Sequence, residues 1–258
     1  MNSIYYEELG EGSVLIFLHG FCESNEIWEE LVPDLSNHFR VISLDLPGFG
    51  KSPILKPSLT IKEVGSTVIE FIESLHVQKC VVIGHSLGGY VALAIAEQRP
   101  DLVQGLCLFH STAQGDSEEK KLNRNKVMAF VNEHGVRPFI ETFVPGLFFQ
   151  KNHGNIEKVH KIASKTSEKA FLAYSHAMRD RPDMTGFLKS FPNPILLIVG
   201  EKDSIISTFA LQDQLKLIRN GKLIIMAETG HMGMFEDAKE SIRQLKDFSK
   251  SCFLKGKL

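Results

Sequence analysis

Short runs of valine, isoleucine and leucine recur along the chain, separated by stretches with helical periodicity. Runs that are apolar on both faces are typical of a parallel sheet covered by helices on each side. Residues 61–76, 87–98 and 236–250 carry the helical pattern, and Thr60 with Glu63 forms a capping box before the first. The alternation predicts an α/β fold with a mostly parallel, twisted sheet flanked by helices. The expected strands are VLIFLHG (14–20), RVISLDL (40–46), KCVVIGH (79–85), LVQGLCLFH (102–110), PILLIVGEKD (194–203) and KLIIMAETGH (222–231).

The alternation stops between Thr112 and Thr185. This stretch has no comparable apolar run, and it contains the charged segment DSEEKKLNRNK (116–126). Its phenylalanines recur at roughly helical spacing, and a structureless loop of this length is uncommon inside a compact domain. We therefore expect residues 112–185 to form a helical cap, and residues 1–111 and 186–258 to form one core domain.

Composition excludes several classes of function. The formal net charge of −2 gives no electrostatic reason to expect a nucleic acid or an anionic membrane as partner. No apolar run approaches the roughly 20 residues that span a bilayer, and the first twelve residues lack the pattern of a secretory signal. The four cysteines are scattered, and no His, Cys or carboxylate spacing suits a metal. We expect a cytoplasmic protein, monomeric or homodimeric, with no metal and no other cofactor.

The segment GHSLG (84–88) matches the pattern G-x-S-x-G, with a predicted strand before it and a predicted helix after it. A sharp strand-to-helix turn strains the central residue, and side chains on either side of it would collide, so glycine flanks it. The hydroxyl of Ser86 then projects at the positive end of a helix. Here the sequence resembles the α/β-hydrolase superfamily, in which a serine at this position is the nucleophile.

A serine nucleophile needs a base, and the base needs an acid that orients it. The family's chain order is serine, acid, histidine. Asp203 ends a predicted strand in a segment that resembles the family's acid loop, and His231 lies in GHMGMFE, which resembles the histidine loop. Both follow parallel strands, at the edge where open α/β sheets assemble their sites. We interpret the alternative acids, Glu201 and Asp213, as surface residues.

By the same resemblance, HGFCES (19–24) is the oxyanion loop. The backbone N–H groups of Phe21 and Leu87 are the expected donors to the oxyanion. We expect His19 to hold this loop by hydrogen bonds, and His85 to project away from the nucleophile and not to act as a base.

Two further segments have structural interpretations. DLPGFGKS (45–52) resembles a family signature and is expected to form a tight loop without chemistry. In FHST (109–112), where some family members place the acid, there is no carboxylate, which favours Asp203. We expect His110 and His176 to be structural.

The resemblance covers roughly residues 12–111 and 190–250, and it implies acyl transfer to water. Ser86 would attack a carbonyl carbon, His231 would act as general base, and Asp203 would orient it. A phenylalanine-rich cap favours a small to medium, largely apolar carboxylic ester, or a lactone, as the substrate. The residues expected to line the substrate pocket are Phe130, Phe143, Phe148 and Met232.

Two alternatives remain open. A C–C bond hydrolase or lyase, or an enol-lactone hydrolase, acting on a carboxylated substrate would need cations. The cap offers Arg124, Arg137, Arg179 and Arg181 for that task. A ligand-binding signalling protein built on a hydrolase scaffold is an alternative of another class.

Overall fold

The computed structural model describes residues 4–54, 56 and 58–254. In these residues seven strands form one sheet in the order β1-β3-β2-β4-β5-β6-β7. The pair β1–β3 is antiparallel and every other neighbouring pair is parallel, which confirms the predicted mostly parallel sheet. The strands are β1 (Tyr6–Leu9), β2 (Val14–Leu18), β3 (Arg40–Leu44), β4 (Cys80–His85), β5 (Val103–Phe109), β6 (Ile195–Gly200) and β7 (Gly221–Met226).

Strand β1 has no counterpart in the prediction. Its sequence, YEEL, is short and charged, and its side chains are half-buried or exposed. It pairs with β3 at the sheet edge, where a polar strand needs no apolar alternation.

Each face of the sheet is covered by helices, as the two-sided apolar strands predict. Along β2, Ile16 and Leu18 pack into one hydrophobic cluster, and Leu15 and Phe17 pack into the other. The first cluster includes residues of α2 (Ile61–Ser74), α3 (Leu87–Gln98), α8 (Thr185–Ser190) and α9 (Thr208–Leu215). The second includes residues of the 3₁₀ helix η1 (Asn25–Trp28), α1 (Val32–Leu35), α10 (Gly233–Glu236) and α11 (Ala238–Leu254).

The structure tests the predicted boundaries of two helices. The predicted capping box of α2 is present, with the Glu63 N–H donating to Thr60 Oγ1 at 3.2 Å and the Thr60 N–H donating to Glu63 Oε2 at 2.8 Å. The helix predicted over 236–250 is split at Asp237, which separates α10 from α11.

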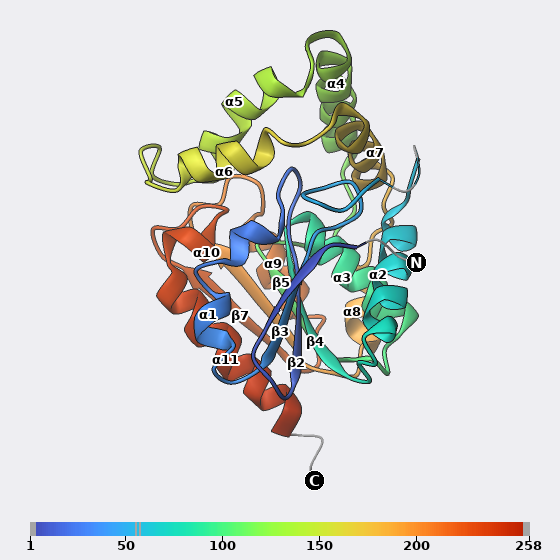
Figure 1. Cartoon of the computed structure of the whole chain (residues 1–258), viewed down its shortest axis with the longest axis vertical. Helices are drawn as coiled ribbons and strands as arrows, with labels where there is room; N and C mark the ends of the chain where they lie inside the picture. Colours follow the sequence, from blue (N-terminus) through green and yellow to red (C-terminus); the bar gives the residue numbers. More distant parts are fainter. Residues whose placement is uncertain (1–3, 55, 57, 255–258) are drawn as a thin grey trace.

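Five helices lie between β5 and β6 in the described residues, and the first four of them lie within the predicted insertion. These four are α4 (Glu118–His134), α5 (Val136–Leu147), α6 (Ile156–Ala163) and α7 (Glu168–Arg179). Figure 1 shows them together at one end of the molecule, beyond the end of the sheet. Their apolar residues join both hydrophobic clusters, so this segment is packed onto the core. The terminal residues 1–3 and 255–258 of the predicted core lie outside the described residues.

Within the described part of the chain, no helix combines the length and the hydropathy needed to cross a membrane. All four cysteines are buried.

Candidate active site

Ser86 sits on a strained turn between β4 and α3. Its backbone has φ 49° and ψ −113°, a conformation that non-glycine residues adopt only when the surroundings impose it. A Cβ atom on Gly84 would lie 2.3 Å from the Gly88 carbonyl oxygen, and one on Gly88 would lie 2.3 Å from the carbonyl oxygen of Leu18. The flanking glycines are therefore required by close backbone approach, as the motif predicts.

Strand β5 holds the turn from the side. The Ser86 N–H donates to the Phe109 carbonyl oxygen at 3.0 Å, and the Ser111 hydroxyl donates to the Ser86 carbonyl oxygen at 2.7 Å. The strained residue is thus tied to the sheet at both its amide and its carbonyl.

The structure brings Asp203 and His231 together. Nδ1 of His231 lies 2.8 Å from Oδ2 of Asp203, and both side chains are almost completely buried. The other carboxylate oxygen of Asp203 accepts the N–H groups of Ile205 and Ile206, at 2.8 and 3.0 Å. The alternative acids lie at the surface, where Glu201 pairs with Lys202 and Asp213 pairs with Lys216.

A second histidine, His110, contacts the same carboxylate, a partner that the sequence did not predict. Its Nδ1 lies 3.1 Å from Oδ2 of Asp203, and its Nε2 is buried with no partner among the described residues. We place the proton on Nδ1, because the other tautomer would aim a lone pair at the carboxylate and bury an unsatisfied Nε2–H. The Gly200 N–H lies 3.3 Å from the same nitrogen, and the shorter carboxylate contact decides the tautomer.

The electrostatics of this cluster follow from burial and from charge. Burial alone would raise the pKa of Asp203, but the charge and the N–H groups of the two histidines outweigh it and hold that pKa below its usual range. Burial would lower the pKa of His231, and the charge of Asp203 raises it overall. Burial lowers the pKa of His110 to about 4, so that it is neutral at pH 7. The cluster therefore holds one carboxylate between two imidazoles.

The ligating atoms of His110, Asp203 and His231 lie within 4.8 Å of one another, a separation that a metal ion can also use. We interpret the cluster as hydrogen-bonded, because the carboxylate already receives four N–H groups.

The predicted oxyanion loop follows β2. His19 lies at its start, where its Nδ1–H donates to the Gly20 carbonyl oxygen at 2.8 Å and its Nε2 accepts the Leu46 N–H at 2.9 Å. Burial lowers the pKa of His19, which keeps the ring neutral as these two bonds require. His19 therefore holds the loop, as predicted. The N–H groups of Phe21 and Leu87 donate to no other residue in the described part of the chain.

The loop that carries His231 is attached to the inserted helices. The His231 N–H donates to the Leu147 carbonyl oxygen at 2.7 Å. Oε2 of Glu236 accepts the Gly230 and Met232 N–H groups, at 3.0 and 3.1 Å, and its Oε1 accepts the N–H of Phe149 at 2.7 Å. Glu236 was not singled out in the sequence, although a carboxylate in the first turn of a helix was the available sign.

The sequence of this chain matches a protein family described as alpha/beta hydrolase fold over residues 13–238. The chain belongs to that family. The resemblance carried by the GHSLG segment is thereby confirmed.

Known proteins similar to this α/β hydrolase differ in reaction. A pimeloyl-[acyl-carrier protein] methyl ester esterase of Wigglesworthia glossinidia brevipalpis is 28% identical over 80% of this chain and 81% of that protein. A dihydrolipoyllysine-residue acetyltransferase component of an acetoin cleaving system, from Pseudomonas putida, is 28% identical over 95% of this chain, which spans 65% of its length. The solved structure of a thermophilic esterase from Thermogutta terrifontis is 28% identical with a TM-score of 0.92, covering 96% of this chain and 93% of that one. This protein is a hydrolase of the alpha/beta fold.

Aromatic rings connect the oxyanion loop of this α/β hydrolase to the inserted helices. The Phe21 ring lies 4.9 Å from Phe171 on α7 and 6.5 Å from Phe143 on α5. We call the connected rings the aromatic group: Phe21, Phe49, Phe139, Phe143, Phe171 and Tyr174. Phe49, Phe171 and Tyr174 are fully buried, and the other three rings are half-buried, next to the predicted oxyanion donor.

Of the four residues predicted to line the substrate pocket, Phe143 belongs to this group. Phe148 and Met232 are fully buried in the hydrophobic core, with Phe148 stacked on His153 at 5.1 Å. Phe130 is 41% exposed on α4 and packs against His134 one turn later. This position does not support the prediction for Phe130, because its ring faces solvent and lies apart from the aromatic group.

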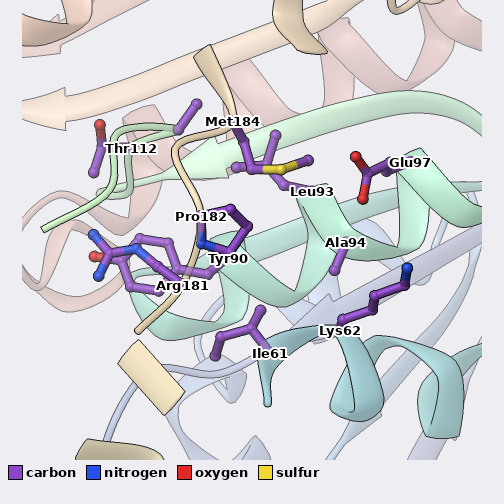
Figure 2. A pocket seen from close by; sticks show the side chains of 11 residues that line it. Ile61, Lys62, Tyr90, Leu93, Ala94, Glu97, Thr112, Arg181, Pro182 and Met184 are labelled. Atoms are coloured by element: carbon purple, nitrogen blue, oxygen red, sulfur yellow. The ribbon is translucent and has the colours of Figure 1, made fainter. Parts of the chain in front are cut away.

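A small apolar cavity lies elsewhere, between α2, α3 and residues 181–184 (Figure 2). The Arg181 guanidinium lies 3.9 Å from the centre of the Tyr90 ring beside it. The cavity encloses about 60 Å³, and none of the three predicted catalytic residues lines it. Because small-molecule sites enclose roughly 300–1,000 Å³, we do not assign the substrate to this cavity.

The arginines that might have bound a carboxylated substrate are already paired. Arg124 and Arg181 both contact Asp116, Arg137 pairs with a glutamate one turn along its own helix, and Arg179 pairs with the next residue in sequence. His176 is exposed. Each of these four arginines therefore already contacts a carboxylate of the chain, with Asp116 shared by two of them.

Proposed function

We propose that this α/β hydrolase is a serine hydrolase that cleaves small to medium, largely apolar carboxylic esters. The observation that carries the proposal is the 2.8 Å contact between His231 Nδ1 and Asp203 Oδ2. A carboxylate accepts only, so the contact requires the proton on Nδ1. In the neutral ring, Nε2 then bears a lone pair and is free to act as a base.

In the first half of the reaction, Nε2 of His231 takes the hydroxyl proton of Ser86 as Oγ attacks the carbonyl carbon of the ester. The negative charge that develops on the carbonyl oxygen is met by the N–H groups of Phe21 and Leu87, worth about 3 kcal/mol each. His231 passes the proton to the departing alcohol, and an acyl-enzyme remains on Ser86. Asp203 stabilises the imidazolium between these two proton transfers.

In the second half, His231 takes a proton from water, which attacks the acyl carbon. The tetrahedral intermediate forms in the same oxyanion hole, and its collapse releases the acid and returns the proton to Ser86. Both halves use the same five residues, and only Ser86 and His231 exchange a proton.

We also propose that residues 112–185 form a cap that selects the substrate. The aromatic group joins this segment to the oxyanion loop, and each of the four arginines of the segment already contacts a carboxylate of the chain. Both features favour an uncharged acyl group over the carboxylated substrates of the alternative reactions.

The test is the Ser86→Ala variant, assayed with p-nitrophenyl acetate and butyrate. We expect hydrolysis to fall to background and labelling by a fluorophosphonate probe to disappear, while Ser190→Ala on α8 keeps both. Wild-type turnover by Ser86→Ala would refute the proposal. A stoichiometric burst without steady-state turnover would instead support the ligand-binding alternative, and a panel of lactones and ring diones tests the other reactions.

A further inference from the structure

His85, the residue just before the nucleophile, is hydrogen-bonded at both ring nitrogens. Its Nδ1 lies 2.9 Å from Oε2 of Glu23, and its Nε2 lies 3.0 Å from the carbonyl oxygen of His231. The His85 side chain is completely buried, and that of Glu23 is 3% exposed. The ring therefore bridges the oxyanion loop and the loop of the predicted base.

Neither partner of the ring has a hydrogen to give. A carbonyl oxygen only accepts, and Oε2 of Glu23 already accepts the Gly20 N–H at 2.6 Å. Each of the two contacts therefore needs a proton on the imidazole nitrogen. A neutral imidazole has one N–H, so either neutral tautomer would leave one buried contact between two lone pairs.

We propose that His85 is a buried imidazolium, paired with the Glu23 carboxylate, and that the pair positions the oxyanion loop against the His231 loop. The inference rests on the proposed function, because it assigns a task within that site. His85 and Glu23 act through other groups: Glu23 holds the amide of Gly20, next to the predicted oxyanion donor Phe21, and His85 holds the backbone of the base.

The charge balance around the ring agrees with this assignment. Burial alone would raise the pKa of Glu23, but the charge and the hydrogen bond of His85 outweigh it and hold that pKa below its usual range. The ring of His85 lies 4.9 Å from that of His231, which must become positive during catalysis. Since the Glu23 carboxylate neutralises His85, the pair adds little net charge to oppose this step. The titratable groups around His85 are Glu23, His19, His110 and His231. Asp203 is hydrogen-bonded to both His110 and His231.

The first test is ¹⁵N NMR of the histidine side chains at the pH of the esterase assay, which distinguishes a doubly protonated ring from either neutral tautomer. We expect His85 of the wild-type protein to show both ring nitrogens protonated, and the His85→Gln variant to lack that pair of resonances. A neutral pattern for His85 would overturn the proposal. The wild-type spectrum decides this even if His85→Gln does not fold, with assignment then made through the Glu23→Gln spectrum.

The second test is kinetic. Glu23→Gln keeps the shape of the side chain and an acceptor for Gly20, but it removes the charge. We expect the kcat for p-nitrophenyl butyrate to fall about tenfold to hundredfold, because a small displacement of catalytic groups lowers the rate by such factors. The KM should change less than about threefold. His134→Gln, an exposed histidine on α4, is the control and should match the wild type.

The outcomes separate this inference from the function that it rests on. Activity in Ser86→Ala would remove the proposed function whatever His85 does. An inactive Ser86→Ala variant together with a wild-type kcat in folded Glu23→Gln would overturn the positioning role alone.

Discussion

Replacing Gly88 by alanine should move the helix that follows Ser86 away from the predicted oxyanion loop. The new Cβ would lie 2.3 Å from the carbonyl oxygen of Leu18 and 2.7 Å from that of His19. Ordinary van der Waals contact begins at 3.4 Å, so these atoms must move apart by about 1 Å. All of the clashing atoms belong to backbone, at the end of β2 and the start of α3, and no side-chain rotation can relieve the contact.

A shift of this size acts on the proposed chemistry, because Leu87 directly precedes Gly88 on one side of the contact and Phe21 follows His19 on the other. Misplacing reacting groups by about 1 Å costs on the order of 10²-fold in rate. We therefore expect Gly88→Ala to lower the kcat for p-nitrophenyl butyrate about a hundredfold, measured per molecule of folded protein after a urea denaturation curve.

The matched control is Gly186→Ala, the same chemical change in helix α8. A Cβ on Gly186 meets no atom within 4 Å, so we expect wild-type kcat and a free energy of unfolding higher by up to about 1 kcal/mol. A folded Gly88→Ala protein with wild-type kcat would show that the close approach is not needed, and it would refute the reasoning.

Three further predictions concern the base, a helix cap and the aromatic group. Since Asp203 raises the pKa of His231 from its usual 6.5 and the base must be neutral, kcat/KM should rise with pH through a midpoint above 6.5. Asp203→Asn should lower kcat on the order of 10⁴-fold, and a pH–rate profile with a midpoint at or below 6.5 would contradict this account. Thr60→Ala removes the side-chain cap of α2 and should lower the free energy of unfolding by about 1 kcal/mol with kcat unchanged, so an unaltered urea midpoint would count against it. Phe143→Leu should raise the KM for p-nitrophenyl butyrate severalfold, whereas Phe130→Leu should not, and equal KM values in both variants would remove the aromatic group from substrate binding.

Patterns that repeat within a few residues predicted most of the fold. Six strands and helix α3 lie where the sequence pattern places them. For the five inner strands the reason is that burial on both faces demands apolar residues at every position. Strand β7 lies at the sheet edge, and of its residues only Met226 is buried. The sequence did not predict strand β1, because an edge strand tolerates charged residues. It also did not predict the break between α10 and α11 at Asp237, because a local break leaves the helical periodicity intact. The segment GHSLG predicted the turn at Ser86 because the backbone strain of that turn and the crowding at Gly84 involve residues that are close in sequence. The crowding at Gly88 comes instead from Leu18 and His19, at the end of β2.

The sequence by itself determined the α/β class, the strained serine and the chain order in which Asp203 and His231 follow it. The partners of the histidines were decided only by the tertiary structure. His110 meets Asp203 across 93 positions of sequence, and His85 meets Glu23 across 62 and the His231 carbonyl across 146. These contacts depend on which strands lie side by side and on how loops from different strands meet at one sheet edge. A hydrogen bond acts over about 3 Å in space and has no period along the chain, so no local sequence pattern predicts it.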